Sequence, residues 1–170
     1  MAAPKTNSYA LIQAKPFSPN LGAEVYGVDL SETISDAQFA EILDAFLKYQ
    51  VLFFKNQKEI PPEQHVIFGK RFGPLHAHPA APTMEGHPEI FEIHATKDSK
   101  VANGEFWHSD VSCDDTPPLG TMLQIHIAPP YGGDTMFSNM EVAYDDLSDP
   151  MKKMLGGLTA LHSSEHIYKG

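Results

Sequence analysis

The sequence predicts an α+β fold with an antiparallel β core, of the double-stranded β-helix (jelly-roll or cupin-like) kind, with flanking helices. Helical apolar patterns fall mainly in the first half and near residues 140–155. Short apolar or alternating runs, separated by proline and glycine turns, dominate the rest of the chain. A His-x-Asp triplet also precedes a Gly-Gly hairpin, and a jelly-roll double sheet accommodates that combination well.

The bulk composition suits one soluble domain spanning residues 1–170. The net charge of −10 argues against a nucleic-acid partner or an anionic membrane, because phosphate binding needs a basic surface. No apolar run approaches membrane-spanning length, and residues 1–8 lack the apolar core of a signal peptide. Cys113 is the single cysteine, so no intrachain disulfide forms. We therefore expect a cytoplasmic protein without a nucleic-acid or membrane partner.

The first elements alternate between strand and helix. Residues 10–12 and 23–28 are expected to form short strands, joined by a turn region rich in Pro, Asn and Gly. Ser35 should open a helix, with Gln38 at the capping-box spacing. The apolar run 51–54 that follows predicts a buried strand. The apolar face of the helix comprises Phe39, Ile42, Leu43, Phe46 and Leu47.

A second helix is expected to begin at the proline pair 61–62 and to end at Gly73-Pro74. Residues 75–88 are rich in turn formers and predict a loop, and residues 90–94 predict a strand. The polar residues 95–105 predict another loop.

Residues 106–112 read as a short strand that organises the chemistry of the chain. Side chains alternate along a strand, so His108 and Asp110 should share one face. An imidazole and a carboxylate side by side supply two thirds of the two-His-one-carboxylate triad that binds non-haem iron(II) and leaves coordination positions open. Taken alone, however, a His-x-Asp triplet is most often an ordinary surface pair.

The last third predicts a hairpin followed by helices. Residues 121–127 alternate in polarity and should form a strand, and the turn signal at 129–133 leads to a returning strand at 135–137. The remaining expected elements are a helix over 140–147 capped by Asn139, a helix from 149 that ends at Gly156-Gly157, and a strand over 158–162.

These motifs, in this order, resemble the taurine dioxygenase family of iron(II)- and 2-oxoglutarate-dependent oxygenases over nearly the whole chain. The upstream part of the resemblance comprises Gly22-Ala23-Glu24-Val25, Gly27-Val28-Asp29-Leu30, Gln50-Val51-Leu52-Phe53-Phe54 and Arg71-Phe72-Gly73-Pro74-Leu75-His76-x-His78-Pro79. The downstream part comprises Phe106-Trp107-His108-Ser109-Asp110-Val111-Ser112, Thr116-Pro117-Pro118-Leu119-Gly120, Gly132-Gly133-Asp134-Thr135 and Ala143-Tyr144-x-x-Leu147-Ser148. Several motifs in sequence are far more specific than any one of them.

The resemblance implies roles for particular residues. His108 and Asp110 would be the first two iron ligands, and Thr135 would donate a hydrogen bond to a carboxylate of 2-oxoglutarate. His78 matches a histidine of the substrate pocket, while Val111 and Asn103 are further candidates for its wall. The residues alone also allow a solvated loop histidine at 78, a core valine at 111 and an ordinary strand threonine at 135.

The sequence departs from the family in two places. Ala81 stands where the taurine enzymes carry a tyrosine, so we expect a substrate other than taurine. Tyr168, in contrast, matches a family position for an aromatic residue of the pocket. Family members also extend beyond the point that corresponds to residue 170, and their further part carries the distal histidine ligand and an arginine that pairs with 2-oxoglutarate. Since His162 and His166 lack the strand context of that ligand, we expect the C-terminal part of the fold to be missing here.

The function that the resemblance implies is hydroxylation of a small anionic organic molecule, such as a sulfonate, a sulfate ester or an aryloxy or carboxylic acid. The cofactors would be Fe(II), 2-oxoglutarate as co-substrate and O2, with release of succinate and CO2. A homodimer or homotetramer is expected. Two alternatives from other classes remain open. One is a non-catalytic fragment or metal-binding jelly-roll module; the other is a metal-dependent isomerase or sugar-binding sandwich.

Overall fold

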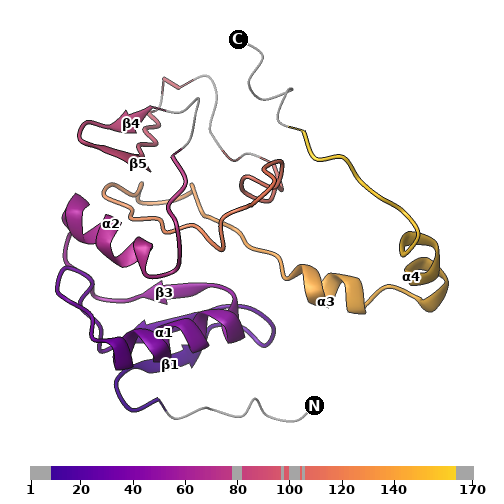
Figure 1. Cartoon of the computed structure of the whole chain (residues 1–170), viewed down its shortest axis with the longest axis horizontal. Coiled ribbons are helices and arrows are strands. Elements are labelled where there is room, and N and C mark those ends of the chain that lie inside the picture. Colours follow the sequence, from indigo (N-terminus) through magenta and orange to yellow (C-terminus); the bar gives the residue numbers. More distant parts are fainter. Residues whose placement is uncertain (1–8, 78–81, 97, 100–103, 105, 164–170) are drawn as a thin grey trace. The chain divides into compact units, whose positions relative to one another are not determined.

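The computed structural model describes residues 9–77, 82–96, 98–99, 104 and 106–163. The chain divides into two compact units, and its trace is drawn in Figure 1. Unit 1 comprises residues 1–60 and 124–158, and unit 2 comprises residues 61–123 and 159–170. Both units contain helix and sheet, so the prediction of a mixed fold is confirmed at this level.

Unit 1 is built on a three-stranded sheet in the order β1-β2-β3. Strand β1 (Gln13–Pro16) pairs antiparallel with β2 (Ala23–Tyr26), which pairs parallel with β3 (Leu52–Phe54). This sheet is therefore mixed, and the expectation of an antiparallel core holds for the β1–β2 pair but not for β2–β3. The reason is the helix between β2 and β3, since a crossover connection brings the second strand back in the same direction.

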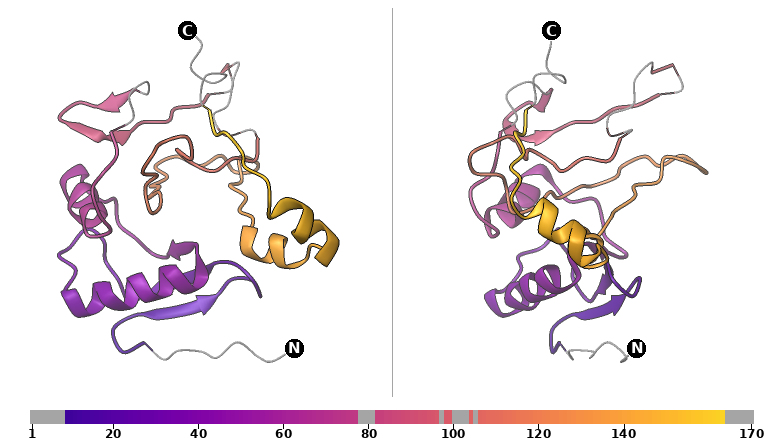
Figure 2. Two further views of the ribbon diagram at one scale, coloured as in Figure 1. Left: turned by 45° about the vertical axis from the view of Figure 1, so that its right-hand side comes forward. Right: turned by 90° about the vertical axis from the view of Figure 1, so that its right-hand side faces the viewer.

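Helix α1 (Asp36–Tyr49) is that crossover, and Figures 1 and 2 show it alongside the sheet of unit 1. The Ser35 side chain accepts a hydrogen bond from the Gln38 backbone N–H at 3.2 Å, which confirms the predicted cap. The Gln38 side chain instead donates to the Gly27 carbonyl. Ile42 and Ala45 are fully buried, as are Ala23 and Val25 of β2. The core of unit 1 therefore lies between α1 and the sheet.

Two expectations for the first strands need correction. Residues 10–12 are not a strand, because the backbone N–H groups of Ala10, Leu11 and Ile12 donate to the Glu41 carboxylate at 2.8–3.0 Å. A backbone donor used in this way is not available to a ladder. Strand β3 is half-buried rather than fully buried.

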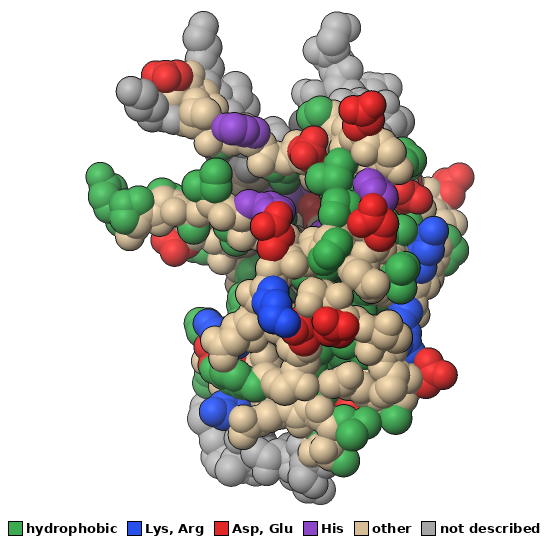
Figure 3. Space-filling view, turned by 90° about the vertical axis from the view of Figure 1, so that its left-hand side faces the viewer, with side chains coloured by type: hydrophobic (Ala, Val, Ile, Leu, Met, Phe, Trp, Pro, Cys, Tyr) green, Lys and Arg blue, Asp and Glu red, His purple; other side chains and the backbone are tan. Residues whose placement is uncertain are grey.

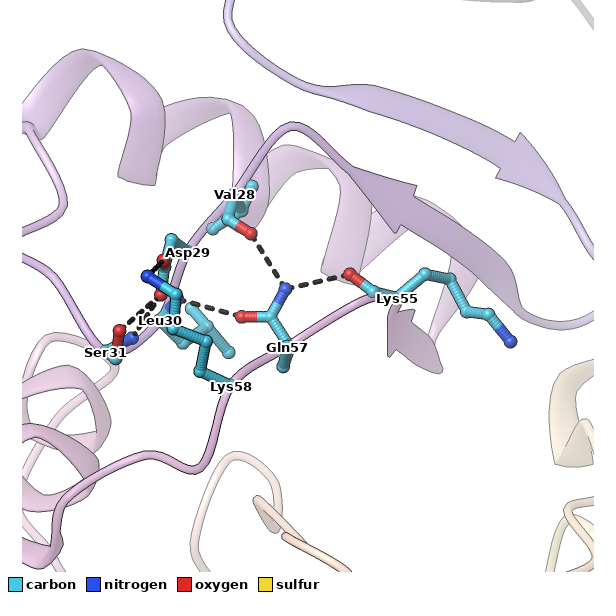
Figure 4. Close-up of polar contacts among 7 residues, drawn as sticks. All are labelled: Val28, Asp29, Leu30, Ser31, Lys55, Gln57 and Lys58. Carbon is cyan, nitrogen blue, oxygen red and sulfur yellow. Dashed lines mark hydrogen bonds and ion pairs between the residues drawn. The ribbon is translucent and has the colours of Figure 1, made fainter.

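A polar network fixes the segment after β2 to the segment after β3, as Figure 4 shows. The Gln57 amide nitrogen donates to the carbonyls of Val28 (2.7 Å) and Lys55 (3.0 Å), and its oxygen accepts from the Leu30 N–H (2.8 Å). The Lys58 ammonium lies 2.9 Å from the Asp29 carboxylate. Chiefly because of that contact, the pKa of Asp29 falls from 3.8 to about 2.

The remaining helices of unit 1 are α3 (Met140–Asp145) and α4 (Asp149–Leu155), both of which were predicted. The Asn139 side chain caps α3 by accepting from the N–H groups of Glu141 and Val142 at 3.0 and 3.1 Å. Its amide also donates to the Asn20 carbonyl at 2.7 Å. Asn139 thus joins the start of α3 to the turn between β1 and β2.

Unit 2 contains helix α2 (Pro62–Lys70) and a hairpin of β4 (Thr83–Met84) and β5 (His87–Phe91), which is visible in Figure 2. The helix begins at the predicted proline pair. The hairpin corrects the predicted loop over residues 75–88, and β5 begins and ends earlier than the expected strand at 90–94. Gly86 explains the hairpin, because its φ of +81° suits the tight turn between the strands.

Several predicted strands are absent from the described part of the chain. Residues 106–112, 121–127, 135–137 and 158–162 carry the expected patterns but form no ladder. A strand pattern becomes a strand only where a neighbour supplies hydrogen bonds. Leu123, Ile125 and Ile127 are accordingly 59%, 64% and 88% exposed.

No described helix is both long enough and apolar enough to cross a bilayer. On the face drawn in Figure 3, acidic side chains are spread over the surface and the basic ones do not merge into one patch. That distribution is consistent with the net charge of −10.

Candidate functional site

The structure brings His108 and Asp110 together in unit 2. The His108 Nε2 atom lies 3.2 Å from the Asp110 Oδ1 atom, and about half of each side chain is exposed. The stretch is not the straight strand that was expected, because the chain turns at Asp110. An Asp114 N–H to Val111 carbonyl hydrogen bond of 3.2 Å closes this turn. The turn therefore keeps the two groups adjacent where strand alternation was expected to do so.

The tautomer of His108 follows from its other ring nitrogen. Nδ1 lies 2.7 Å from the Phe106 carbonyl oxygen, which can only accept a hydrogen bond, so Nδ1 carries a proton. In the neutral ring, Nε2 then holds a lone pair that faces the Asp110 carboxylate. Two lone pairs at this separation repel each other unless a proton or a metal cation lies between them. A backbone carbonyl that fixes the second nitrogen is also the usual companion of a metal-bound histidine.

The distance between the two donor atoms fits a shared divalent cation. Ligand atoms at about 2.1 Å from a metal and at right angles to each other lie about 3 Å apart. The observed 3.2 Å is close to this value. One imidazole and one carboxylate also match the donor types of the non-haem iron(II) site. The pair thus suits two neighbouring positions on one metal.

Thr121 holds the second oxygen of the carboxylate. Its hydroxyl donates to Asp110 Oδ2 at 2.8 Å, so that Oδ1 is the oxygen left facing His108. A hydrogen bond of this kind orients a carboxylate ligand and favours binding through one oxygen. The resemblance to the family implies no role for Thr121. A signal was nevertheless present, because Thr121 directly follows the Thr116–Gly120 motif.

Two more contacts from distant segments reach the turn. The His162 Nδ1 atom lies 2.9 Å from the Ser112 hydroxyl, and the His76 Nε2 atom lies 2.9 Å from the Asp114 carboxylate. His162 was expected to be a strand-end residue, and the structure instead places it beside the turn. Only the fold reveals these contacts, because 50 and 38 residues separate the partners.

The other predicted site residues are not gathered here. Thr135 belongs to unit 1, where it is exposed and outside any strand. The turn before it was predicted correctly, since Gly132 and Gly133 have φ angles of +75° and +73°. Val111 is half-buried within the turn. His78, Asn103, Ala81, His166 and Tyr168 lie outside the described residues.

A third ligand is not found in the described part of the chain, which contains no group of three or more His, Cys, Asp or Glu side chains that could hold a metal. Cys113 is exposed and lies next to the Asp114 carboxylate, so it does not join the pair. Within the described residues, His108 and Asp110 can therefore supply two ligands to a metal.

Comparison with known proteins gives a consistent match. Residues 13–169 match the family described as "Taurine catabolism dioxygenase TauD, TfdA family". An alkylsulfatase of Acinetobacter baylyi is 35% identical over 159 residues, which are 94% of this chain and 49% of the relative. An alpha-ketoglutarate-dependent sulfate ester dioxygenase of Pseudomonas putida is 32% identical over 168 residues, covering 98% of this chain and 55% of the relative.

A solved structure agrees with these matches. The crystal structure of a taurine dioxygenase from Burkholderia xenovorans superposes with a TM-score of 0.69 and 37% identity, over 86% of this chain and 51% of that one. The chain thus spans about half the length of the relatives that it matches.

Proposed function

Because the chain belongs to the taurine catabolism dioxygenase TauD, TfdA family, we propose that it carries metal ligands of an iron(II)- and 2-oxoglutarate-dependent dioxygenase that hydroxylates a small anionic organic molecule. The sulfate ester dioxygenase among the relatives favours a sulfate ester or a chemically similar sulfonate as substrate. One observation carries the proposal. His108 Nε2 and Asp110 Oδ1 face each other at 3.2 Å, while the other polar atom of each side chain is engaged by Phe106 and Thr121.

In this proposal each residue has a defined part. His108 donates the Nε2 lone pair to the metal, and the Phe106 carbonyl keeps the ring in the required tautomer. Asp110 binds through Oδ1 while Thr121 holds Oδ2. By resemblance to the family, Thr135 would bind a carboxylate of 2-oxoglutarate, and Val111 and His78 would belong to the substrate pocket. Bound iron(II) with 2-oxoglutarate and O2 supplies the oxidising chemistry, and the protein positions the reactants.

We propose further that the whole protein has the double-stranded β-helix typical of this family. The alternating pattern of residues 121–127 and the high exposure of Leu123, Ile125 and Ile127 support this fold. In the described residues this segment forms no ladder.

Succinate formation in the whole protein tests the proposed activity. Wild-type protein should release succinate when supplied with iron(II), 2-oxoglutarate, O2 and a matching sulfate ester or sulfonate. His108→Ala and Asp110→Ala should abolish this release, because each removes a metal ligand. His126→Ala is a matched control, since His126 also lies near an acidic group, at 3.5 Å from Glu59, but in unit 1. Normal turnover by either ligand variant would refute the assignment.

A metal-binding module without turnover is the second candidate. It is favoured by the His108–Asp110 pair itself, which supplies two metal ligands at a separation of 3.2 Å. In that case Mn²⁺, used as a probe, should bind weakly through His108 and Asp110. No candidate anion should then stimulate succinate release.

A further inference from the structure

In the turn at residues 110–114, the candidate metal ligand Asp110 is followed directly by a strained backbone position, Val111. Val111 has a φ of +50°, in the left-handed region. A β-branched side chain is strongly disfavoured there, because its branches crowd the backbone. Such a conformation persists only where the surroundings determine it. The 3.2 Å hydrogen bond that closes the turn is a single local contact, so the surroundings must supply further restraint.

Two side chains from distant segments supply that restraint. His162 contacts the Ser112 hydroxyl at 2.9 Å, one residue after Val111. His76 contacts the Asp114 carboxylate at 2.9 Å, and its Nε2 must donate because an ionised carboxylate only accepts. Ser112 is half-buried, and the His76 side chain is 28% exposed. The turn is thus tied to residues on both sides of it in the sequence.

We propose that His162 and His76 are positioning residues, which hold the 110–114 turn so that Asp110 Oδ1 stays opposite His108 Nε2. The proposal rests on the proposed metal-binding role of the His108–Asp110 pair. It assigns His162 a task other than ligation, since its Nδ1 atom is engaged by Ser112 and not by the pair. Without these contacts Val111 can relax to a negative φ. That change would reorient the preceding carboxylate and separate the two donor atoms.

The first part of the test is metal affinity. The dissociation constant of Mn²⁺ should be measured by electron paramagnetic resonance on the whole protein. His162→Ala and Ser112→Ala should each weaken binding about tenfold, the usual effect of losing a residue that orients a ligand. The double variant should be no weaker than either single variant, because both remove the same contact. His76→Ala and Asp114→Ala form a second such pair.

Conservative variants separate positioning from folding. Ser112→Thr keeps the hydroxyl, and His162→Asn offers an amide near the place of Nδ1, so both should bind Mn²⁺ within about twofold of wild type. His126→Ala is the control for loss of an exposed histidine and should leave affinity unchanged. A purely structural role for His162 would lower the melting temperature of His162→Ala without changing its Mn²⁺ affinity, and this result would overturn the proposal.

Hydrogen exchange keeps the two proposals distinguishable. Amides of residues 111–114 should exchange faster in His162→Ala and His76→Ala than in wild type, whether or not metal is present. Failure of the wild-type protein to bind Mn²⁺ would overturn the proposed function. Unchanged exchange at the turn would overturn the positioning role of the two histidines.

Discussion

Replacing Thr121 by Val should weaken divalent metal binding at the His108–Asp110 pair. The substitution keeps the shape of the side chain but removes the hydroxyl that donates to Asp110 Oδ2 at 2.8 Å. The freed carboxylate can then rotate, so that Oδ1 no longer faces His108 Nε2 for most of the time. The result is a loss of affinity with little change in packing, since Thr121 is exposed.

The size of the effect follows from the exposure of the carboxylate. A hydrogen bond to a charged group contributes about 1.5–3 kcal/mol when it is shielded from water. The Asp110 side chain is 51% exposed, so water replaces part of the lost interaction. About 1 kcal/mol remains, which corresponds to an approximately fivefold larger dissociation constant.

Isothermal titration of Mn²⁺ into the whole protein measures this change directly. Thr121→Ser is the matched control, because it retains the hydroxyl and should bind as wild type does. Equal affinity of Thr121→Val and wild type would show that the hydroxyl does not orient Asp110. A Thr121→Ser variant as weak as Thr121→Val would show that the methyl group, and not the hydroxyl, sets the affinity.

Three further predictions concern unit 1. Ile42→Ala should lower the free energy of unfolding by about 2–5 kcal/mol, because Ile42 is fully buried. Leu47→Ala, at a 64% exposed position of the same helix, should change the free energy of unfolding by less than about 0.5 kcal/mol, and equal urea midpoints for the two variants would contradict this. Gly22→Ala should lower the melting temperature more than Gly132→Ala, because both have positive φ but only at Gly22 would the new Cβ meet a ring, 3.2 Å from Phe53. Asp29 should stabilise the fold above its unfolded pKa of 3.8, and this contribution should be lost as pH falls toward its folded pKa of about 2. The melting temperature of Asp29→Asn should therefore fall less over that pH range than that of wild type, and parallel curves would argue against the Lys58 contact.

Local signals in the sequence predict the helices well. Ser35 with Gln38, the prolines at 61–62 and Asn139 mark helix starts that the structure confirms. These signals act within one turn of helix and need no distant partner. The strands are different, because a ladder depends on the neighbour that the chain supplies. Residues 10–12 read as a strand until Glu41, on a helix some 30 residues later, takes their N–H groups.

In the candidate site, too, the local features were predictable from the sequence and the contacts with distant segments were not. The spacing of His108 and Asp110 is enough to predict that they meet, because only one residue separates them. Their supporting contacts could not be predicted, since Thr121, His76 and His162 reach the turn from separate segments. The bend at Asp110 was also missed, because nothing in a β-branched residue such as Val111 signals a positive φ.

The position of the buried core along the chain also has a consequence for the order of folding during synthesis. All but one of the buried apolar residues identified in the structure lie between Ile12 and Ile60, and the exception is Phe68. The β2–β3 ladder and the Glu41 contacts also close within residues 10–60. The part of unit 1 that lies between residues 10 and 60 can therefore form on the ribosome before His108 has been translated. Substitutions at His108 or Asp110 should therefore leave these early folding steps unchanged.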